Sequence, residues 1–114
     1  MTIREISSII QGEVLCGEAF LDQLQLCAFA SDLMSDVLTI KVDNFMLITG
    51  LANIQSIRTA EMSDIKCILL VRGKEATSDM IELANENGIV LLRTPYSMFK
   101  TSGMLYAAGL SPVY

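Results

Sequence analysis

Three short apolar runs constrain the fold of this chain more than any other feature. "FMLIT", "KCILLV" and "IVLLR" begin at Phe45, Lys66 and Ile89, which are 21 and 23 positions apart. Each run is apolar throughout instead of alternating, as in strands buried on both faces of a parallel sheet. Amphipathic segments separate the runs. The repetition predicts a three-layer α/β/α domain with right-handed crossovers and a mostly parallel sheet of about four to five strands.

The helices between these runs carry recognisable boundaries. Asn53 is expected to cap the first, with Ile54, Ile57 and Met62 facing inward. The second runs through "TSDMIELANEN" and closes on Gly88. Its predicted inward residues are Met80, Ile81, Leu83 and Ala84.

The last helix is expected to follow Pro95, a residue favoured in the first turn. Its predicted inward stripe is Phe99, Gly103, Tyr106 and Leu110. At the other end of the chain, Thr2 and Glu5 have capping-box spacing, and Gly12 marks a helix end. The inward face of that first helix is Ile3, Ile6 and Ile10.

Residues 13–42 give a weaker pattern. "EVLCG" is typical of a short strand, and Leu24, Leu26, Ala28 and Ala30 alternate as in another, although residues 21–25 also fit a helix. Ser31 and Asp32 are expected to cap a short helix through "DLMSDVLTI", whose tail could equally extend toward Val42. The strand order of this region stays open.

Composition limits the class of protein. Hydrophobic residues make up 52% of the 114 residues and charged residues 18%, which excludes disorder and fits one domain over residues 1–114. No apolar run approaches the roughly 18 residues that span a bilayer, and no signal-peptide block opens the chain. We expect a cytoplasmic protein that does not bind membranes.

The charge and the missing residue types exclude several activities. A net charge of −5 with only 8 Lys and Arg disfavours nucleic-acid binding. The chain has no histidine, and its three cysteines form no CxxC, so neither a metal site nor a cofactor is expected. Cys27 and Cys67 are predicted core residues. Phosphate-loop and GxGxxG motifs are absent, and no nucleophile, base and orienting group are assembled, so the chain is not expected to be an enzyme.

The predicted strand ends supply the candidate site. Ligands of open α/β sheets bind beyond the carboxyl ends of the strands, near helix N-termini. Those ends carry polar pairs: Ser31-Asp32, Thr49-Gly50, Arg72-Gly73 and Arg93-Thr94. Glycine permits a sharp turn and a close approach, and guanidinium binds carboxylate or phosphate. This pattern predicts a small anionic ligand.

A second interpretation of the arginines stays open. An arginine that leaves a buried strand can extend to the sheet edge and pair with Asp32 or with a residue of a partner subunit. The site would then serve assembly, with a protein partner or as a homodimer, and would hold no small molecule. An enzyme that uses Asp32 with Arg93 is a third and weaker alternative.

The residues from Ile68 to Phe99, "ILLVRGKEATSDMIELANENGIVLLRTPYSMF", resemble the second half of the DRTGG domain and of the related N-terminal domain of HPr kinase/phosphorylase. In these families an apolar strand also ends in Arg-Gly, an acidic helix ends at glycine, and a strand reading Leu-Leu-Arg-Thr leads to the last helix. The matching positions are Arg72, Gly73, Gly88, Arg93 and Thr94. The likeness covers about residues 25–110 and is clearest over the last 35 or so.

The chain departs from the residues that give the DRTGG family its name. Leu51-Ala52 stands where Asp-Arg is expected, and "VRG" stands in place of Thr-Gly-Gly. This favours the HPr-kinase-like branch, although the phosphate loop of the kinase domain is absent. The resemblance implies a non-enzymatic regulatory or assembly module, of a type also found fused to CBS domains and phosphotransacetylases, here expected to stand alone.

Overall fold

The computed structural model describes all 114 residues as an α/β fold built on one six-stranded sheet. The strand order is β1-β5-β4-β3-β2-β6, in which β1 pairs antiparallel with β5 and every other pair is parallel. The predicted fold class is therefore confirmed. The strands are β1 (Glu13–Cys16), β2 (Cys27–Ala30), β3 (Met46–Thr49), β4 (Cys67–Leu70), β5 (Val90–Arg93) and β6 (Ser111–Pro112).

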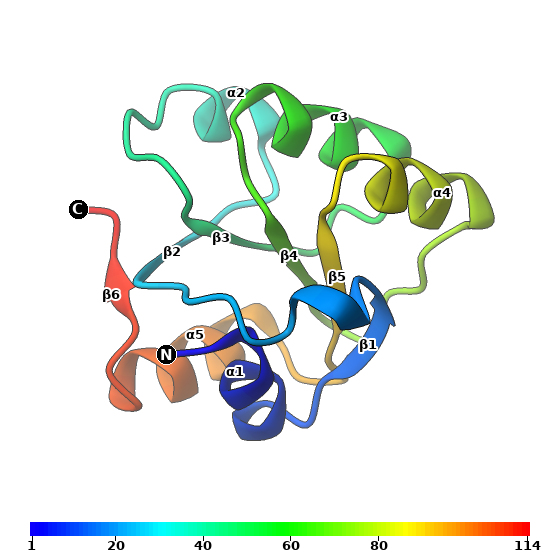
Figure 1. Cartoon of the computed structure of the whole chain (residues 1–114). Coiled ribbons are helices and arrows are strands. Elements are labelled where there is room, and N and C mark those ends of the chain that lie inside the picture. The colour runs from blue at the N-terminus through cyan, green and yellow to red at the C-terminus, as the bar shows by residue number, and fades with distance from the viewer.

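The helices form two layers, one on each face of the sheet (Figure 1). Helices α2, α3 and α4 cover one face, and α1 and α5 cover the other. Their bounds are α1 (Ile3–Ile9), α2 (Met34–Val37), α3 (Ile54–Met62), α4 (Ser78–Glu86) and α5 (Met98–Ala107), with a 3-10 turn at Glu18–Phe20.

The unbroken apolar runs follow from this double cover. Leu47 and Ile68 point into the core beneath α2, α3 and α4. Their neighbours Met46 and Leu69 point into the core beneath α1 and α5. Because both faces are covered, every residue of β3 and β4 is buried, and the only polar residue, Thr49, stands at the last position of β3.

Most predicted helix boundaries are confirmed. Thr2 and Glu5 form the capping box of α1, and Asn53 accepts hydrogen bonds from Gln55 N and Ser56 N at the start of α3. Helix α4 begins after Thr77, whose side chain accepts from Met80 N. Gly88 follows α4 with φ of +64°, the left-handed conformation that ends many helices.

The predicted strand over residues 24–30 is too long. Strand β2 begins at Cys27, and Leu24 and Leu26 are 58% and 71% exposed. Leu24 forms only an isolated bridge with Thr2, so this segment runs outside the two cores. The predicted capping role of Ser31 and Asp32 is also wrong, because the N-cap of α2 is Leu33.

The predicted inward face of the last helix is wrong except at Leu110, which is buried. Helix α5 begins at Met98 with Ser97 as its N-cap, so Pro95 lies in the preceding loop. Phe99 and Tyr106 are 89% and 69% exposed, whereas Thr101 and Leu105 are buried. Met62, at the end of α3, is likewise exposed. The chain then returns to the sheet as β6, which pairs with β2 and was not anticipated.

Candidate functional site

The four predicted strand-end pairs lie in one row at the carboxyl edge of the sheet. The ladder continues past the strands, since Ser31 N donates to Ile48 O over 3.0 Å and Thr94 N donates to Leu70 O over 2.9 Å. Across the row the order is Arg93 on β5, Arg72 after β4, Gly50 after β3 and Asp32 after β2. The topology thus brings together residues that are up to 61 positions apart in sequence.

The Asp32 carboxylate is the centre of this row. Its Oδ1 accepts from Gly50 N over 2.6 Å and from Thr49 Oγ1 over 3.2 Å. Its Oδ2 faces Arg72 Nη1 at 3.4 Å. The Gly50 N–H, with smaller contributions from Thr49 and Arg72, holds the pKa of Asp32 below its usual value, against the opposing effect of desolvation. We call Asp32, Thr49, Gly50 and Arg72 the Asp32 site.

Glycine at position 50 lets the Arg72 guanidinium lie against its backbone. A β-carbon on Gly50 would stand 2.6 Å from Arg72 Cζ, well inside van der Waals contact. The Arg72 side chain is still 46% exposed. The backbone of Arg72, in contrast, is held in place by a hydrogen bond from Arg72 N to Tyr96 O over 2.7 Å.

Arg93 sits at the same edge but has different partners. Its guanidinium pairs with Glu13 and, at 3.5 Å, with Glu75. Glu13 lies directly opposite Arg93 in the antiparallel β1–β5 pair. With only 27% of its side chain exposed, Arg93 is more enclosed than Arg72. The structure therefore pairs Asp32 with Arg72 and not with Arg93.

The remaining predicted site residues have their polar groups engaged in the fold. The buried Thr94 hydroxyl donates to Ile10 O over 2.7 Å, and Gly73 N donates to Thr94 O. Ser31 Oγ accepts from Leu33 N over 3.0 Å. These groups position the edge, and Arg72 is the charged side chain there that has a single, exposed ion-pair partner.

Sequence reasoning missed the partners of Arg93. Glu13 and Glu75 lie in separate segments, and only the pairing of β1 with β5 explains why Glu13 is near. It also missed Lys100, whose Nζ lies 3.9 Å above the Tyr96 ring close to where Arg72 N is anchored. No group of three His, Cys, Asp or Glu side chains could hold a metal ion.

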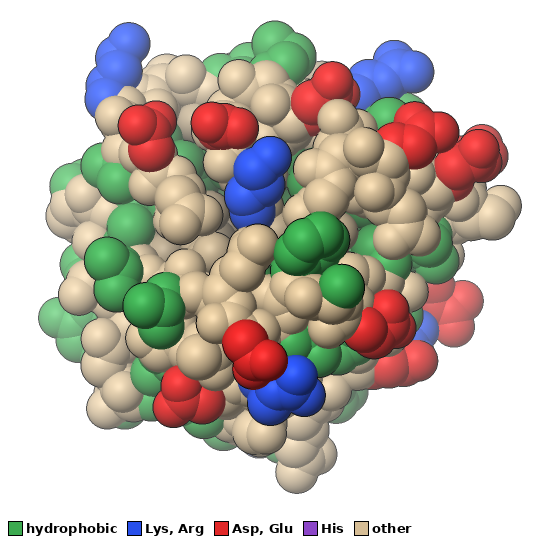
Figure 2. Space-filling model, in the orientation of Figure 1, with side chains coloured by type: hydrophobic (Ala, Val, Ile, Leu, Met, Phe, Trp, Pro, Cys, Tyr) green, Lys and Arg blue, Asp and Glu red, His purple; other side chains and the backbone are tan.

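The distribution of charge on the surface is consistent with a ligand site that has few cationic side chains. Figure 2 shows acidic and basic side chains interspersed, with no continuous basic patch on the face in view. The net charge of the chain is −5. No helix has the length and apolar character needed to cross a membrane.

The family of the chain follows from comparison with known sequences. The model of the DRTGG domain matches residues 5–108, which include every strand except β6. The chain belongs to the DRTGG domain family. The match confirms the predicted resemblance at the level of the family, and the HPr-kinase-like branch stays a prediction. No curated protein sequence matches this DRTGG domain.

A solved structure shares the fold. It comprises the CBS and DRTGG domains of the regulatory region of Clostridium perfringens pyrophosphatase, complexed with the activator diadenosine tetraphosphate. The TM-score is 0.72 at 17% sequence identity, and the match covers 98% of the DRTGG domain described here and 48% of the other chain. The present chain thus spans about half the length of that structure.

Proposed function

We propose that this DRTGG domain is a non-enzymatic regulatory module of the cytoplasm that binds a small phosphorylated metabolite or nucleotide at the Asp32 site. The supporting observation is the set of three donors around the Asp32 carboxylate: Gly50 N–H, the Thr49 hydroxyl and the Arg72 guanidinium. Such a set is an anion-binding arrangement, and Asp32 is its internal anion.

The ion pair can be exchanged at low cost. Asp32 and Arg72 are about half exposed and 3.4 Å apart, and surface pairs of this kind contribute roughly 0–1 kcal/mol. A phosphate offers Arg72 more charge and a bidentate contact. The phosphate would replace Asp32 as the ion-pair partner of the Arg72 guanidinium, and the Asp32 carboxylate would keep its hydrogen bond from Gly50 N. Because Arg72 is anchored to Tyr96 through its backbone, the exchange would also act on the loop before α5.

Two further observations support this function. The pyrophosphatase region that shares the fold is regulatory and was solved with a nucleotide activator, so a phosphorylated regulator is a reasonable ligand class. The chain has no histidine and no assembled acid–base pair that could act on such a ligand. The residues Leu51-Ala52, in place of Asp-Arg, lead us to place the domain in the HPr-kinase-like branch.

Thermal unfolding tests the proposal with diadenosine tetraphosphate and pyrophosphate as probes. A ligand at 100 times its dissociation constant stabilises the folded state by about 2.7 kcal/mol, which is readily measured as a rise in Tm. We expect that rise for the wild type, a larger one for Asp32→Asn, which removes the competing charge, and little for Arg72→Gln. Equal shifts in all three proteins, or none with either probe, would contradict the proposal.

A second candidate function, assembly, is favoured by the outer face of α5. Phe99 and Tyr106 are exposed there, one on each side of Gly103, around which there is open space for a partner. In this alternative the domain forms a homodimer or binds a protein, and the arginines pair within the chain or with a partner and hold no small molecule. Phe99→Ser should then lower the molar mass measured by light scattering. A wild-type mass of one chain from micromolar to millimolar concentration would eliminate the homodimer.

A further inference from the structure

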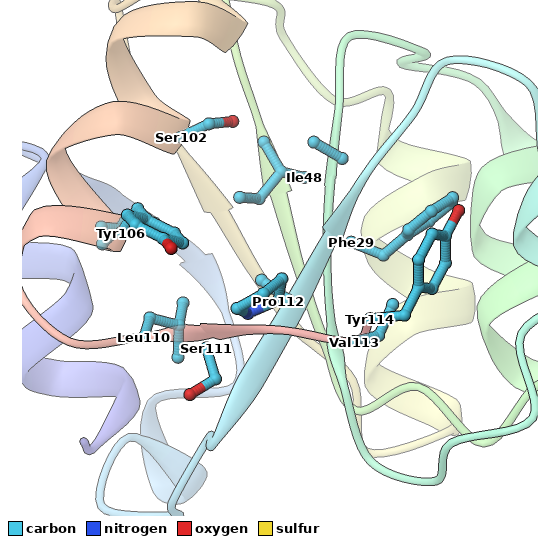
Figure 3. A pocket seen from close by; sticks show the side chains of 12 residues that line it. Phe29, Ile48, Ser102, Tyr106, Leu110, Ser111, Pro112, Val113 and Tyr114 are labelled. Atoms are coloured by element: carbon cyan, nitrogen blue, oxygen red, sulfur yellow. The ribbon is translucent and has the colours of Figure 1, made fainter.

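A separate pocket lies between helix α5 and the β2–β6 edge of the sheet. Its volume is about 290 Å³, at the lower end of the roughly 300–1,000 Å³ found for ligand sites. Figure 3 shows Ser102 and Tyr106 on α5 facing Ile48 and Pro112, with Phe29 and Tyr114 on the other side of strand β2, where Phe29 packs against the core beneath α2, α3 and α4. The pocket is distinct from the Asp32 site, none of whose four residues line it.

The lining favours a neutral ligand. None of the twelve lining side chains carries a charge, and nine of the residues are hydrophobic. A phosphate or carboxylate would therefore lose its hydration without gaining an ion pair. The ring of Tyr106 instead offers a flat apolar surface against which another ring can pack, whereas the ring of Tyr114 packs against Phe29.

One lining side chain has an unmet hydrogen-bonding requirement. Ser102 Oγ is buried and has no hydrogen-bond partner in the protein. A buried hydroxyl without a partner is costly, and most such groups in folded proteins are satisfied by the protein or by ordered water. Ser102 points from α5 into the region in front of Ile48 (Figure 3). A ligand in the pocket would give this hydroxyl a partner.

The edge of β2 offers a second polar contact. Strand β6 pairs only Ser111 with Cys27 and Pro112 with Ala28, and the last bond runs from Val113 N to Ala28 O. Successive residues of a strand direct their N–H and C=O groups to opposite sides. Ser31 N donates to Ile48 O of β3, so the peptide groups of Ala30, like the carbonyl of Ala28, point away from β3 toward the β6 side. The N–H and C=O of Ala30 thus face the open edge beside the pocket without a strand to pair with.

We propose that this pocket binds a neutral heteroaromatic ring of the purine class. The ring packs between Tyr106 and the β2 edge, its adjacent donor and acceptor atoms pair with the Ala30 peptide groups, and Ser102 Oγ supplies one further hydrogen bond. This inference goes beyond the proposed function, because it needs neither Arg72 nor a phosphate. Five of the lining residues lie after residue 108, outside the family match, so the pocket belongs to this chain's C-terminal segment.

Adenosine, which has no phosphate, is the probe for this pocket. Titrating it into the isotope-labelled protein should produce saturable chemical-shift changes at the amides of Ala30, Ser102 and Leu105, with a dissociation constant on the order of 0.1 mM. Ser102→Leu, which fills the pocket, should weaken binding at least tenfold. Ser102→Ala, which preserves the shape and removes the hydroxyl, should weaken it several-fold. Ser8→Leu, on an exposed position of α1, should bind as the wild type does.

Two sets of outcomes separate this inference from the proposed function. Pocket shifts that persist in Arg72→Gln and vanish in a folded Ser102→Leu variant support the pocket, whether or not pyrophosphate binds at Arg72. Absence of saturable shifts up to the solubility limit of adenosine, shifts at other residues, or equal affinity in Ser102→Leu and Ser8→Leu would overturn it. A loss of pyrophosphate binding alone would count only against the Asp32 site.

Discussion

The Arg72 guanidinium lies against the backbone of Gly50 while it faces the Asp32 carboxylate. In Gly50→Ala the new β-carbon would stand 2.6 Å from Arg72 Cζ, so the flexible arginine must move away. We expect a loss of about 1 kcal/mol or less in the free energy of unfolding, because a surface ion pair is weak, together with a changed ligand affinity. Urea unfolding and a pyrophosphate titration measure the two effects.

Gly103→Ala is the matched control. This glycine lies inside α5 with open space around it, so alanine should raise the free energy of unfolding by about 0.5–1 kcal/mol through helix propensity. A loss in Gly50→Ala of several kcal/mol would mean that Arg72 cannot move, contrary to its exposed, flexible position.

Acid should weaken the fold partly through Asp32. The pKa of this carboxyl is lowered, chiefly by Gly50 N–H, so its contribution to stability is present above the unfolded pKa of about 3.9 and is lost as the pH falls through the folded value. Unfolding free energies of Asp32→Asn should therefore fall less steeply than those of the wild type below about pH 4. Asp43→Asn, in an exposed loop, serves as control. Parallel curves for all three proteins would refute the Asp32 contribution.

Gly17 should be the least replaceable glycine of the chain. It has φ of +92°, and a β-carbon there would stand 2.8 Å from the Val90 Cα, which is backbone and cannot step aside. Gly17→Ala is expected to cost about 3 kcal/mol from the combined backbone strain and overpacking. Gly73→Ala shares a positive φ but has open space, so it should cost only about 1 kcal/mol. Equal losses in urea unfolding would show that the contact with β5 is unimportant.

The thiols should be inert in the folded protein. Burial raises the pKa of Cys67 to about 12 and also raises the pKa of Cys16 and Cys27. Stability from the Cys67 thiol is full below its unfolded pKa of about 8.5 and declines as the pH rises toward the folded value. With a chromogenic disulfide reagent at pH 8, we expect slow reaction at the partly exposed Cys27 alone, absent in Cys27→Ser. Rapid labelling of native Cys67 would argue against this core.

The sequence predicts the βα units well because β3, β4 and β5 are covered on both faces. Two-sided burial produces apolar runs that no exposed strand would show, and the caps at Thr2, Asn53 and Gly88 mark the helices independently. Helix α5 is different, since it is apolar on nearly every side. Its periodicity therefore cannot identify the buried face, which includes Thr101 as well as Leu105.

The candidate site was predictable in its location and not in its pairings. Polar residues at strand ends reveal the carboxyl edge, but the partner of each arginine depends on strand order. Arg93 pairs with Glu13 because β1 joins β5 antiparallel, over a separation of 80 residues that carries no local signal. Asp32 resembles a helix cap in sequence, yet its carboxylate accepts a hydrogen bond from Gly50 N, just after the neighbouring strand β3.

Isothermal titration calorimetry with pyrophosphate, which has no purine ring to enter the α5 pocket, tests the central claim most directly. The three proteins to compare are the wild type, Arg72→Gln and Arg58→Gln, which removes an exposed arginine of α3. Loss of a charged hydrogen bond costs about 1.5–3 kcal/mol, so Arg72→Gln should bind at least tenfold more weakly, whereas Arg58→Gln should match the wild type. If both variants bind as the wild type does, or if the wild type binds no phosphorylated ligand, the Asp32 site is not a ligand site.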